Sequence, residues 1–175
     1  TGGSGFSNAR IGQPDIGLMT MTEMANHAKN MAVAVDIPLI ADGDTGYGGV
    51  LNVIRTVQEH ERAGIAAIQL EDQIFPKRGG HMEGKQLISK EDMVAKIRAA
   101  VSARRSEDFV IIARTDARAV AGLEEATHRA RAYADAGADV IFVEAPQTVD
   151  EMKETARAVK SPLMAKMVEK GKTPF

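Results

Sequence analysis

Short apolar segments rich in β-branched residues alternate along this chain with longer segments whose apolar residues recur at helical spacing. Strands are predicted at 37–41, 66–70, 109–113, 139–143 and 163–165. Helices are predicted at 90–104, 123–136 and 149–159, and another around Val53, Ile54 and Val57. Strands that alternate with helices at this pitch run parallel and are joined by helical crossovers, so the sequence predicts an α/β fold.

A fainter unit precedes these. The apolar run 16–19 is predicted as a strand, and Thr22 as the cap of a helix whose Met24 and Met31 fill the core. About six strands result, whereas a (β/α)8 TIM-type barrel has eight strands and typically ~250 residues. We interpret residues 1–175 as a single barrel domain that is incomplete at both ends. An open, doubly wound sheet is the alternative, but no phosphate-binding glycine fingerprint follows the first strand.

Composition excludes several classes of protein. A formal net charge of -2 provides no basic footprint for nucleic acid or for an anionic membrane surface. The absence of cysteine excludes disulfides, thiolate zinc sites and a cysteine nucleophile. The apolar runs are far shorter than the ~20 residues that a membrane helix needs. We therefore expect a soluble, cytoplasmic protein.

Charged residues follow nearly every predicted strand. They are Asp42, Asp44, Glu71, Asp72, Arg114, Asp116, Glu144 and Lys166. In a barrel these positions meet at the carboxyl-end rim, where active sites form. Converging carboxylates without His or Cys beside them favour Mg²⁺ or Mn²⁺, and the planar guanidinium of Arg114 suits a substrate carboxylate or phosphate. Taken singly, such acidic residues are more often helix caps or solvated loop residues.

The segment 75–85 is basic, contains glycine and is too long for a simple strand-to-helix turn. It is predicted to be a mobile lid over the rim, with a solvated loop as the alternative. His81 lies in this segment, whereas His27, His60 and His128 lie within helical patterns and are predicted to be structural or exposed.

Six segments together resemble the isocitrate lyase and phosphoenolpyruvate mutase superfamily, especially its methylisocitrate lyase-like branch. They are ADGDTGYGG (41–49), LEDQ (70–73), PKRGGHMEGK (76–85), IARTDAR (112–118), FVEAP (142–146) and MVEKGKTP (167–174). The resemblance covers nearly the whole chain. It implies an α/β barrel, usually a homotetramer, that uses Mg²⁺ to bind a small 2-oxo or 2-hydroxy carboxylate.

The resemblance also implies roles for individual residues. Asp42 would bind the metal directly, with Asp44 and Glu71 holding it largely through water, and Asp15 would lie near the metal. Substrate would be bound by the glycine-rich turn of Gly2, Gly3 and Ser4 and by Gly80 and Lys166, with Arg114 and Glu144 around it and His81 on a gating loop.

Two positions depart from the family pattern. Gly79 stands where the lyases carry a Cys that protonates the departing carboxylate fragment, and Lys166 replaces an Asn that contacts substrate. The leading hypothesis is a Mg²⁺-dependent carbon–carbon lyase of the methylisocitrate lyase type. The alternatives are a decarboxylase of oxaloacetate or a phosphonomutase of the same superfamily, and a catalytically inactive ligand-binding homologue.

Overall fold

The computed structural model describes residues 2–79, 82–168 and 171–174. In this part of the chain five parallel strands form one sheet, and strands adjacent in the sequence are adjacent in the sheet. The elements are α1 (Gly3–Ile11), α2 (Met21–Ala34), β1 (Ile40–Asp42), α3 (Val50–Arg62), β2 (Ala67–Glu71), α4 (Lys90–Ala103), β3 (Val110–Thr115), α5 (Ala117–Ala121), α6 (Leu123–Asp135), β4 (Val140–Val143), α7 (Val149–Ala158) and β5 (Leu163–Met164). The predicted α/β architecture is confirmed.

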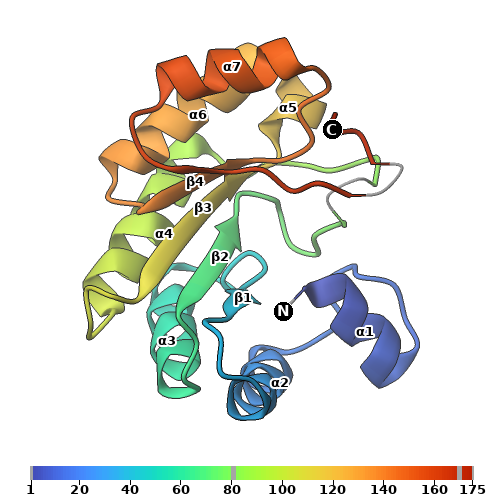
Figure 1. The fold of residues 1–175 in the computed structure, drawn as a ribbon, viewed down its shortest axis with the longest axis vertical. Helices are drawn as coiled ribbons and strands as arrows, with labels where there is room; N and C mark the ends of the chain where they lie inside the picture. Colours follow the sequence, from blue (N-terminus) through green and yellow to red (C-terminus); the bar gives the residue numbers. More distant parts are fainter. Residues whose placement is uncertain (1, 80–81, 169–170, 175) are drawn as a thin grey trace.

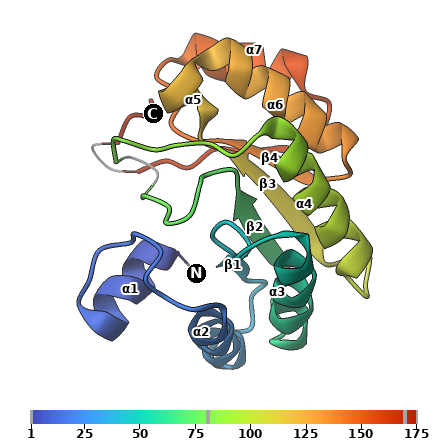
Figure 2. The same cartoon turned by 180° about the vertical axis from the view of Figure 1, so that it is seen from behind.

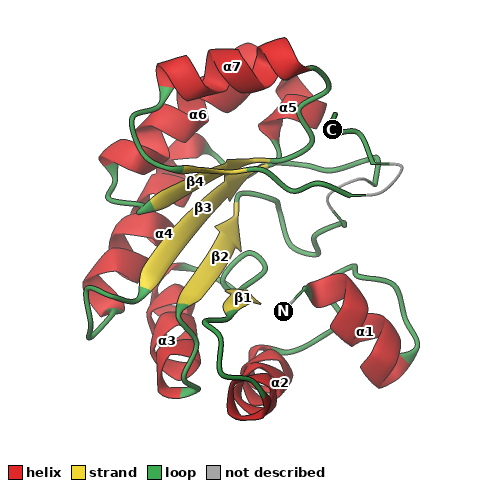
Figure 3. Cartoon of the chain, in the orientation of Figure 1, coloured by secondary structure: helices red, strands yellow, loops and turns green. Residues whose placement is uncertain are grey.

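Helices cover one face of the sheet. Helices α3, α4 and α6 lie side by side along it, while α2 packs beside α3 and α1 lies apart from the sheet beyond β1 (Figures 1 and 2). The long loop after β2 and the segment after β5 run on the open side of the sheet, as the loop colouring in Figure 3 shows. The opposite face of the sheet is thereby left to the loops (Figure 3).

Side chains alternate between the two faces along each strand, and this alternation positions the polar residues. In β2, Ile68 and Leu70 join the core beneath the helices, whereas Ala67 packs on the other face with Ile112 and Phe142. The open face therefore continues into polar side chains at the carboxyl ends of the strands.

The predicted helices are confirmed almost to the residue, since α4, α6 and α7 each end one residue earlier than expected. The strand predicted at 16–19 is wrong, because these residues form bends and irregular backbone. The described part of the chain has five strands in place of the expected six. Within the described residues no helix is long and apolar enough to cross a membrane.

The start of α2 also differs from the prediction. Thr20, not Thr22, is the N-cap: its hydroxyl accepts a hydrogen bond from Glu23 N at 3.3 Å, and the Glu23 carboxylate accepts one from Thr20 N at 2.9 Å. This reciprocal pair is a capping box. Met24 is buried, whereas Met31 is 36% exposed, so the prediction that Met31 fills the core is wrong.

Candidate active site

A cavity of about 680 Å³ lies at the carboxyl ends of the strands. It is bounded by the N-terminus of α1, the end of β1, the loop after β2 and the segment after β5. Its lining includes most of the residues that the sequence proposed as a site: Gly2, Gly3, Ser4, Asp15, Asp42, Gly79, Arg114 and Lys166. Asp42, Arg114 and Lys166 meet here, as the meeting of parallel strand ends predicted. The other residues of this set were proposed from the resemblance.

Three of the proposed site residues lie behind this lining. Asp44, Glu71 and Glu144 are buried and contact residues around the cavity. Gly80 and His81 lie outside the described residues, so their proposed roles stay predictions.

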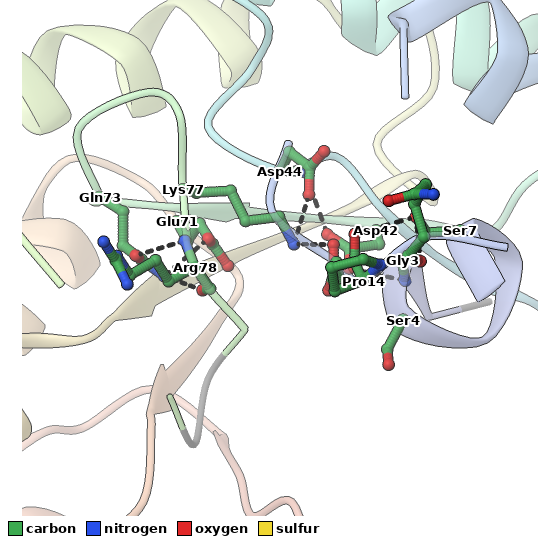
Figure 4. A network of polar contacts seen from close by, with 12 residues as sticks. Gly3, Ser4, Ser7, Pro14, Asp42, Asp44, Glu71, Gln73, Lys77 and Arg78 are labelled. Carbon is green, nitrogen blue, oxygen red and sulfur yellow. Dashed lines mark hydrogen bonds and ion pairs between the residues drawn. The ribbon is translucent and has the colours of Figure 1, made fainter. Parts of the chain in front are cut away.

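A lysine holds the acidic residues together. The Lys77 ammonium lies 2.5 Å from Asp15 Oδ1 and 2.9 Å from Asp44 Oδ1, and its side chain is only 2% exposed (Figure 4). We refer to Asp15, Asp42, Asp44, Glu71 and Lys77 as the cavity cluster. The sequence motif contained Lys77, but nothing in its spacing indicated that the side chain would lie among the carboxylates.

Asp42 is fixed by backbone donors. Its carboxylate accepts hydrogen bonds from Gly3 N and Asp44 N, both at 3.0 Å. The glycine-rich segment implied by the resemblance forms a helix N-terminus, since Gly2 is the N-cap and Gly3 and Ser4 begin α1. Its role in binding substrate stays a prediction. A Cβ atom at Gly3 would lie 2.9 Å from Asp42 Oδ2, so a side chain here would force the carboxylate to move.

Burial and neighbouring charges shift the pKa values in this cluster. Burial favours the neutral form of Asp42, but Lys77 and the two backbone donors outweigh it and lower the pKa of Asp42. Burial, reinforced by the Asp42 charge, raises the pKa of Asp44 to about 6. Burial raises the pKa of Glu71 to about 8, against the opposing attraction of Arg114. For Lys77 the effect of burial is overcome by the surrounding carboxylates, and its pKa is raised.

Arg114 is held by three carboxylates at the end of β3. Its guanidinium lies 2.9 Å from Asp116, 3.1 Å from Glu144 and 3.2 Å from Glu71, and 5.4 Å from the centroid of the Phe142 ring. Burial alone would lower the pKa of Arg114, but these carboxylates raise it. Its planar group is therefore fixed in position and in charge at the cavity wall.

Asp72 does not belong to the rim, which corrects the sequence prediction. Its Oδ2 accepts hydrogen bonds from the hydroxyls of Thr115 and Tyr133, both at 2.7 Å, and from Arg129 at 3.2 Å. Its Oδ1 accepts a bond from Asp116 N at 2.9 Å. We call Asp72, Thr115, Arg129 and Tyr133 the structural cluster. Because Asp72 follows Glu71 directly, strand alternation turns it toward the helices.

The chemistry of the cavity cluster suits a hard cation, although its arrangement is not a closed metal cage. No group of three or more His, Asp or Glu side chains in the described ranges is arranged to hold an ion by itself. Asp44 Oδ1 and Glu71 Oε2 are buried oxygens that are paired with cationic groups, Lys77 Nζ at 2.9 Å and Arg114 Nη1 at 3.2 Å respectively. Mg²⁺ commonly uses one or two carboxylates and retains several waters, so these oxygens fit its requirements.

The chain is similar to known proteins along its whole length. A family model described as phosphoenolpyruvate phosphomutase matches residues 1–175. The chain is 52% identical over 173 residues to 2,3-dimethylmalate lyase of Eubacterium barkeri, covering 99% of this chain and 60% of that protein. It is 55% identical over 165 residues to 2-methylisocitrate lyase of Aeropyrum pernix, covering 94% and 53% respectively. The chain thus spans little more than half the length of these relatives.

Solved structures share the fold. The structure of 2,3-dimethylmalate lyase, described as a PEP mutase/isocitrate lyase superfamily member, matches with a TM-score of 0.96 at 41% identity, covering 100% of this chain and 60% of that one. Oxaloacetate acetylhydrolase with 3,3-difluorooxalacetate matches with a TM-score of 0.94 at 42% identity, covering 99% and 60%. Phosphonopyruvate hydrolase with oxalate and Mg²⁺ matches with a TM-score of 0.79 at 40% identity, covering 92% and 57%. These matches confirm the barrel-type fold predicted from the strand and helix pattern, and they confirm the resemblance to the superfamily.

Proposed function

This chain belongs to the phosphoenolpyruvate mutase/isocitrate lyase superfamily, and from that premise we propose that its protein is a Mg²⁺-dependent carbon–carbon lyase. Its substrate would be a 2-hydroxy di- or tricarboxylate similar to methylisocitrate. Cleavage would release pyruvate or a related oxo acid together with a dicarboxylate such as succinate. The relatives that are named as lyases of 2-methylisocitrate and 2,3-dimethylmalate support this substrate class.

One observation carries the proposal: carboxylates and cationic groups border the same cavity. Asp15 and Asp42 line it together with Arg114 and Lys166. A carboxylate substrate needs cationic groups, and a metal ion that chelates it needs anionic ones, so the cavity provides both.

The metal would be held by the cavity cluster. As the resemblance implies, Asp42 would bind Mg²⁺, or Mn²⁺, directly, while Asp44 and Glu71 would hold it largely through water. When bound, the ion supplies positive charge that stabilises the enolate-like negative charge formed as the carbon–carbon bond breaks.

The chain's own residues would bind and orient the substrate. The N-terminus of α1, with Gly2 and Ser4, lines the cavity and presents the positive end of the helix dipole to a carboxylate. Arg114 is already fixed by its three carboxylate partners, so it would bind an anionic group without losing side-chain freedom. Glu144 would act as a positioning residue for Arg114, and Lys166 would bind a second carboxylate.

The absence of a side-chain acid at Gly79 favours a second candidate function, a decarboxylase. In lyase cleavage the hydroxyl proton leaves the oxygen, the electron pair of the broken bond passes to the dicarboxylate fragment, and that fragment takes a proton at carbon. Gly79 lines the cavity where the resemblance expects the acid, and glycine has no proton to donate. Decarboxylation of oxaloacetate also gives an enolate, which water can protonate, so a decarboxylase is the alternative. A phosphonomutase and an inactive ligand-binding homologue remain further alternatives.

A substrate panel tests these candidates. The purified protein is incubated with Mg²⁺ and 2-methylisocitrate, 2,3-dimethylmalate or oxaloacetate, and oxo acid and carbon dioxide are measured separately. The proposal expects metal-dependent release of oxo acid from a 2-hydroxy acid. Carbon dioxide from oxaloacetate alone would favour the decarboxylase, and binding of Mg²⁺ and oxalate without any turnover would favour the inactive homologue.

We also expect a cytoplasmic homotetramer. Light scattering coupled to size-exclusion chromatography tests the assembly, and a monomer at micromolar concentration would contradict it.

A further inference from the structure

The loop after β2 is closed at its base by strand-like pairing. Gln73 forms an antiparallel bridge with Leu87, and Ile74 N donates a hydrogen bond to Gln86 O at 2.8 Å. The loop leaves and returns at this point, so its base is fixed by backbone atoms. The position of the loop above the base must be set by other contacts.

The Gln73 side chain supplies such a contact. Its Nε2 donates to Arg78 O at 2.8 Å, and its Oε1 accepts from Arg78 N at 3.0 Å, so one amide binds both backbone groups of one residue (Figure 4). The same Nε2 donates to Glu71 Oε1 at 3.0 Å. Gln73 is 1% exposed, and both polar atoms of its side chain are used.

This pattern requires a primary amide of this length. A carboxylate at the position has no proton for Arg78 O and adds a negative charge beside Glu71. A leucine of similar size offers neither a donor nor an acceptor, and asparagine is one methylene shorter. Glutamine is thus selected by the contacts themselves rather than by burial alone.

We call the two hydrogen bonds between the Gln73 amide and the Arg78 backbone the clamp. The clamp holds the segment of the loop that reaches the cavity. Lys77, which precedes Arg78, places its ammonium between Asp15 and Asp44, and Gly79, which follows, lines the cavity. We propose that Gln73 is a positioning residue that fixes residues 77–79 against Glu71 and so couples the loop to the carboxylates of the cavity. The importance of Gln73 for catalysis rests on the proposed function. The positioning of residues 77–79 by Gln73 does not depend on that function.

Limited proteolysis tests the clamp without substrate or metal. Trypsin cleaves after Lys77 and Arg78, and the reference site in the same molecule is the exposed Arg105. We expect Gln73→Leu and Gln73→Glu to accelerate cleavage at 77–79 roughly tenfold relative to Arg105, because the open loop is populated more often once the clamp is lost. Fragments are assigned by mass spectrometry well below each variant's melting temperature.

Tyr133→Phe is the matched control. It removes two buried hydrogen bonds, one that the Tyr133 hydroxyl donates to Asp72 and one that it accepts from Arg129, but it leaves the contacts of Gln73 with Arg78 and Glu71 intact. Its cleavage ratio should equal that of the wild type even though its stability falls. If Gln73→Leu does not fold, Gln73→Asn provides the test, since it keeps the amide but cannot span to both groups.

Steady-state kinetics give a second measurement once a substrate is found. Because Arg114 and the α1 N-terminus are untouched, loss of the clamp should lower kcat about tenfold while KM changes by less than about threefold. A folded Gln73→Leu variant with the wild-type cleavage ratio would overturn the inference. Failure to find any turnover would refute the proposed function and leave the proteolysis result standing.

Discussion

Glu71 and Asp72 are consecutive acidic residues at the end of one strand, yet they belong to differently built surroundings. Asp72, in the structural cluster, accepts four hydrogen bonds, and its side chain is 0% exposed. Glu71, in the cavity cluster, has only two polar side-chain partners in the described residues: Gln73 Nε2 donates to its Oε1, and Arg114 Nη1 lies 3.2 Å from its Oε2. A buried carboxylate whose oxygens all accept hydrogen bonds from the protein stabilises the fold. A buried carboxylate with fewer partners can still bind a ligand.

Replacing an aspartate by asparagine in each of the two clusters tests this comparison most strongly. Asp72→Asn turns an amide toward hydrogen-bond donors and leaves Arg129 with Glu125, at 2.7 Å, as its remaining carboxylate partner, so we expect a loss of about 3 kcal/mol in the free energy of unfolding. Asp44→Asn loses the attraction of Lys77 but relieves repulsion from Asp42, so we expect less than about 1 kcal/mol. Urea denaturation measures both, and equal losses would contradict the distinction.

Metal affinity should fall when the cavity cluster is changed and stay the same when the structural cluster is changed. Asp42→Ala removes the proposed direct ligand, so we expect affinity for Mg²⁺ to fall roughly 100-fold or more in calorimetric titration. Tyr133→Phe should bind Mg²⁺ as the wild type does. Unchanged affinity in Asp42→Ala would refute the assignment of this residue to the metal.

A gain of function can be tested at Gly79. A Cβ at this position would meet Met82 Sδ at 3.3 Å and Asp15 O at 3.8 Å, so a small side chain requires only a shift of flexible Met82. We expect Gly79→Cys to raise lyase activity about tenfold or more by restoring an acid, within the range of general acid catalysis. Gly79→Ala is the control, because it fills the same space without a proton. Equal rates in the two variants would show that proton donation at this position is not the limiting defect.

The smallest effect is expected in the structural cluster itself. Tyr133→Phe removes the hydroxyl donor to Asp72 but leaves three other donors in place, so we expect a loss of about 1 kcal/mol, measured as a shift of the urea midpoint. Turnover should not change. A loss of turnover at full stability would mean that the two clusters are coupled.

The sequence predicted the parts of the site that follow from strand geometry. Asp42, Glu71, Arg114 and Glu144 come together because each ends a parallel strand, which periodicity alone indicates. Strand alternation could also have shown that Asp72 points away from Glu71, but both were assigned to the rim. The Thr20 to Glu23 spacing of a capping box was likewise readable.

Other features could not be predicted from pattern. Lys77 and Gln73 act through a loop of irregular backbone, where neither a helical nor a two-residue period fixes the direction of a side chain. The interaction of Gly3 with Asp42 depends on the packing of α1 across the strand ends, a contact between residues 39 apart in the chain. Such contacts follow from tertiary packing rather than from local sequence.

The sequential order of the strands has a consequence for how the site forms during synthesis. Each strand pairs with the strand that precedes it in the chain, so no pairing has to wait for a strand from a distant part of the sequence. Asp42, Glu71, Arg114 and Glu144 leave the ribosome in the same order as their strands stand in the sheet. Arg114 precedes Glu144, so the cation that pairs with Glu144 is already present when that carboxylate is synthesised.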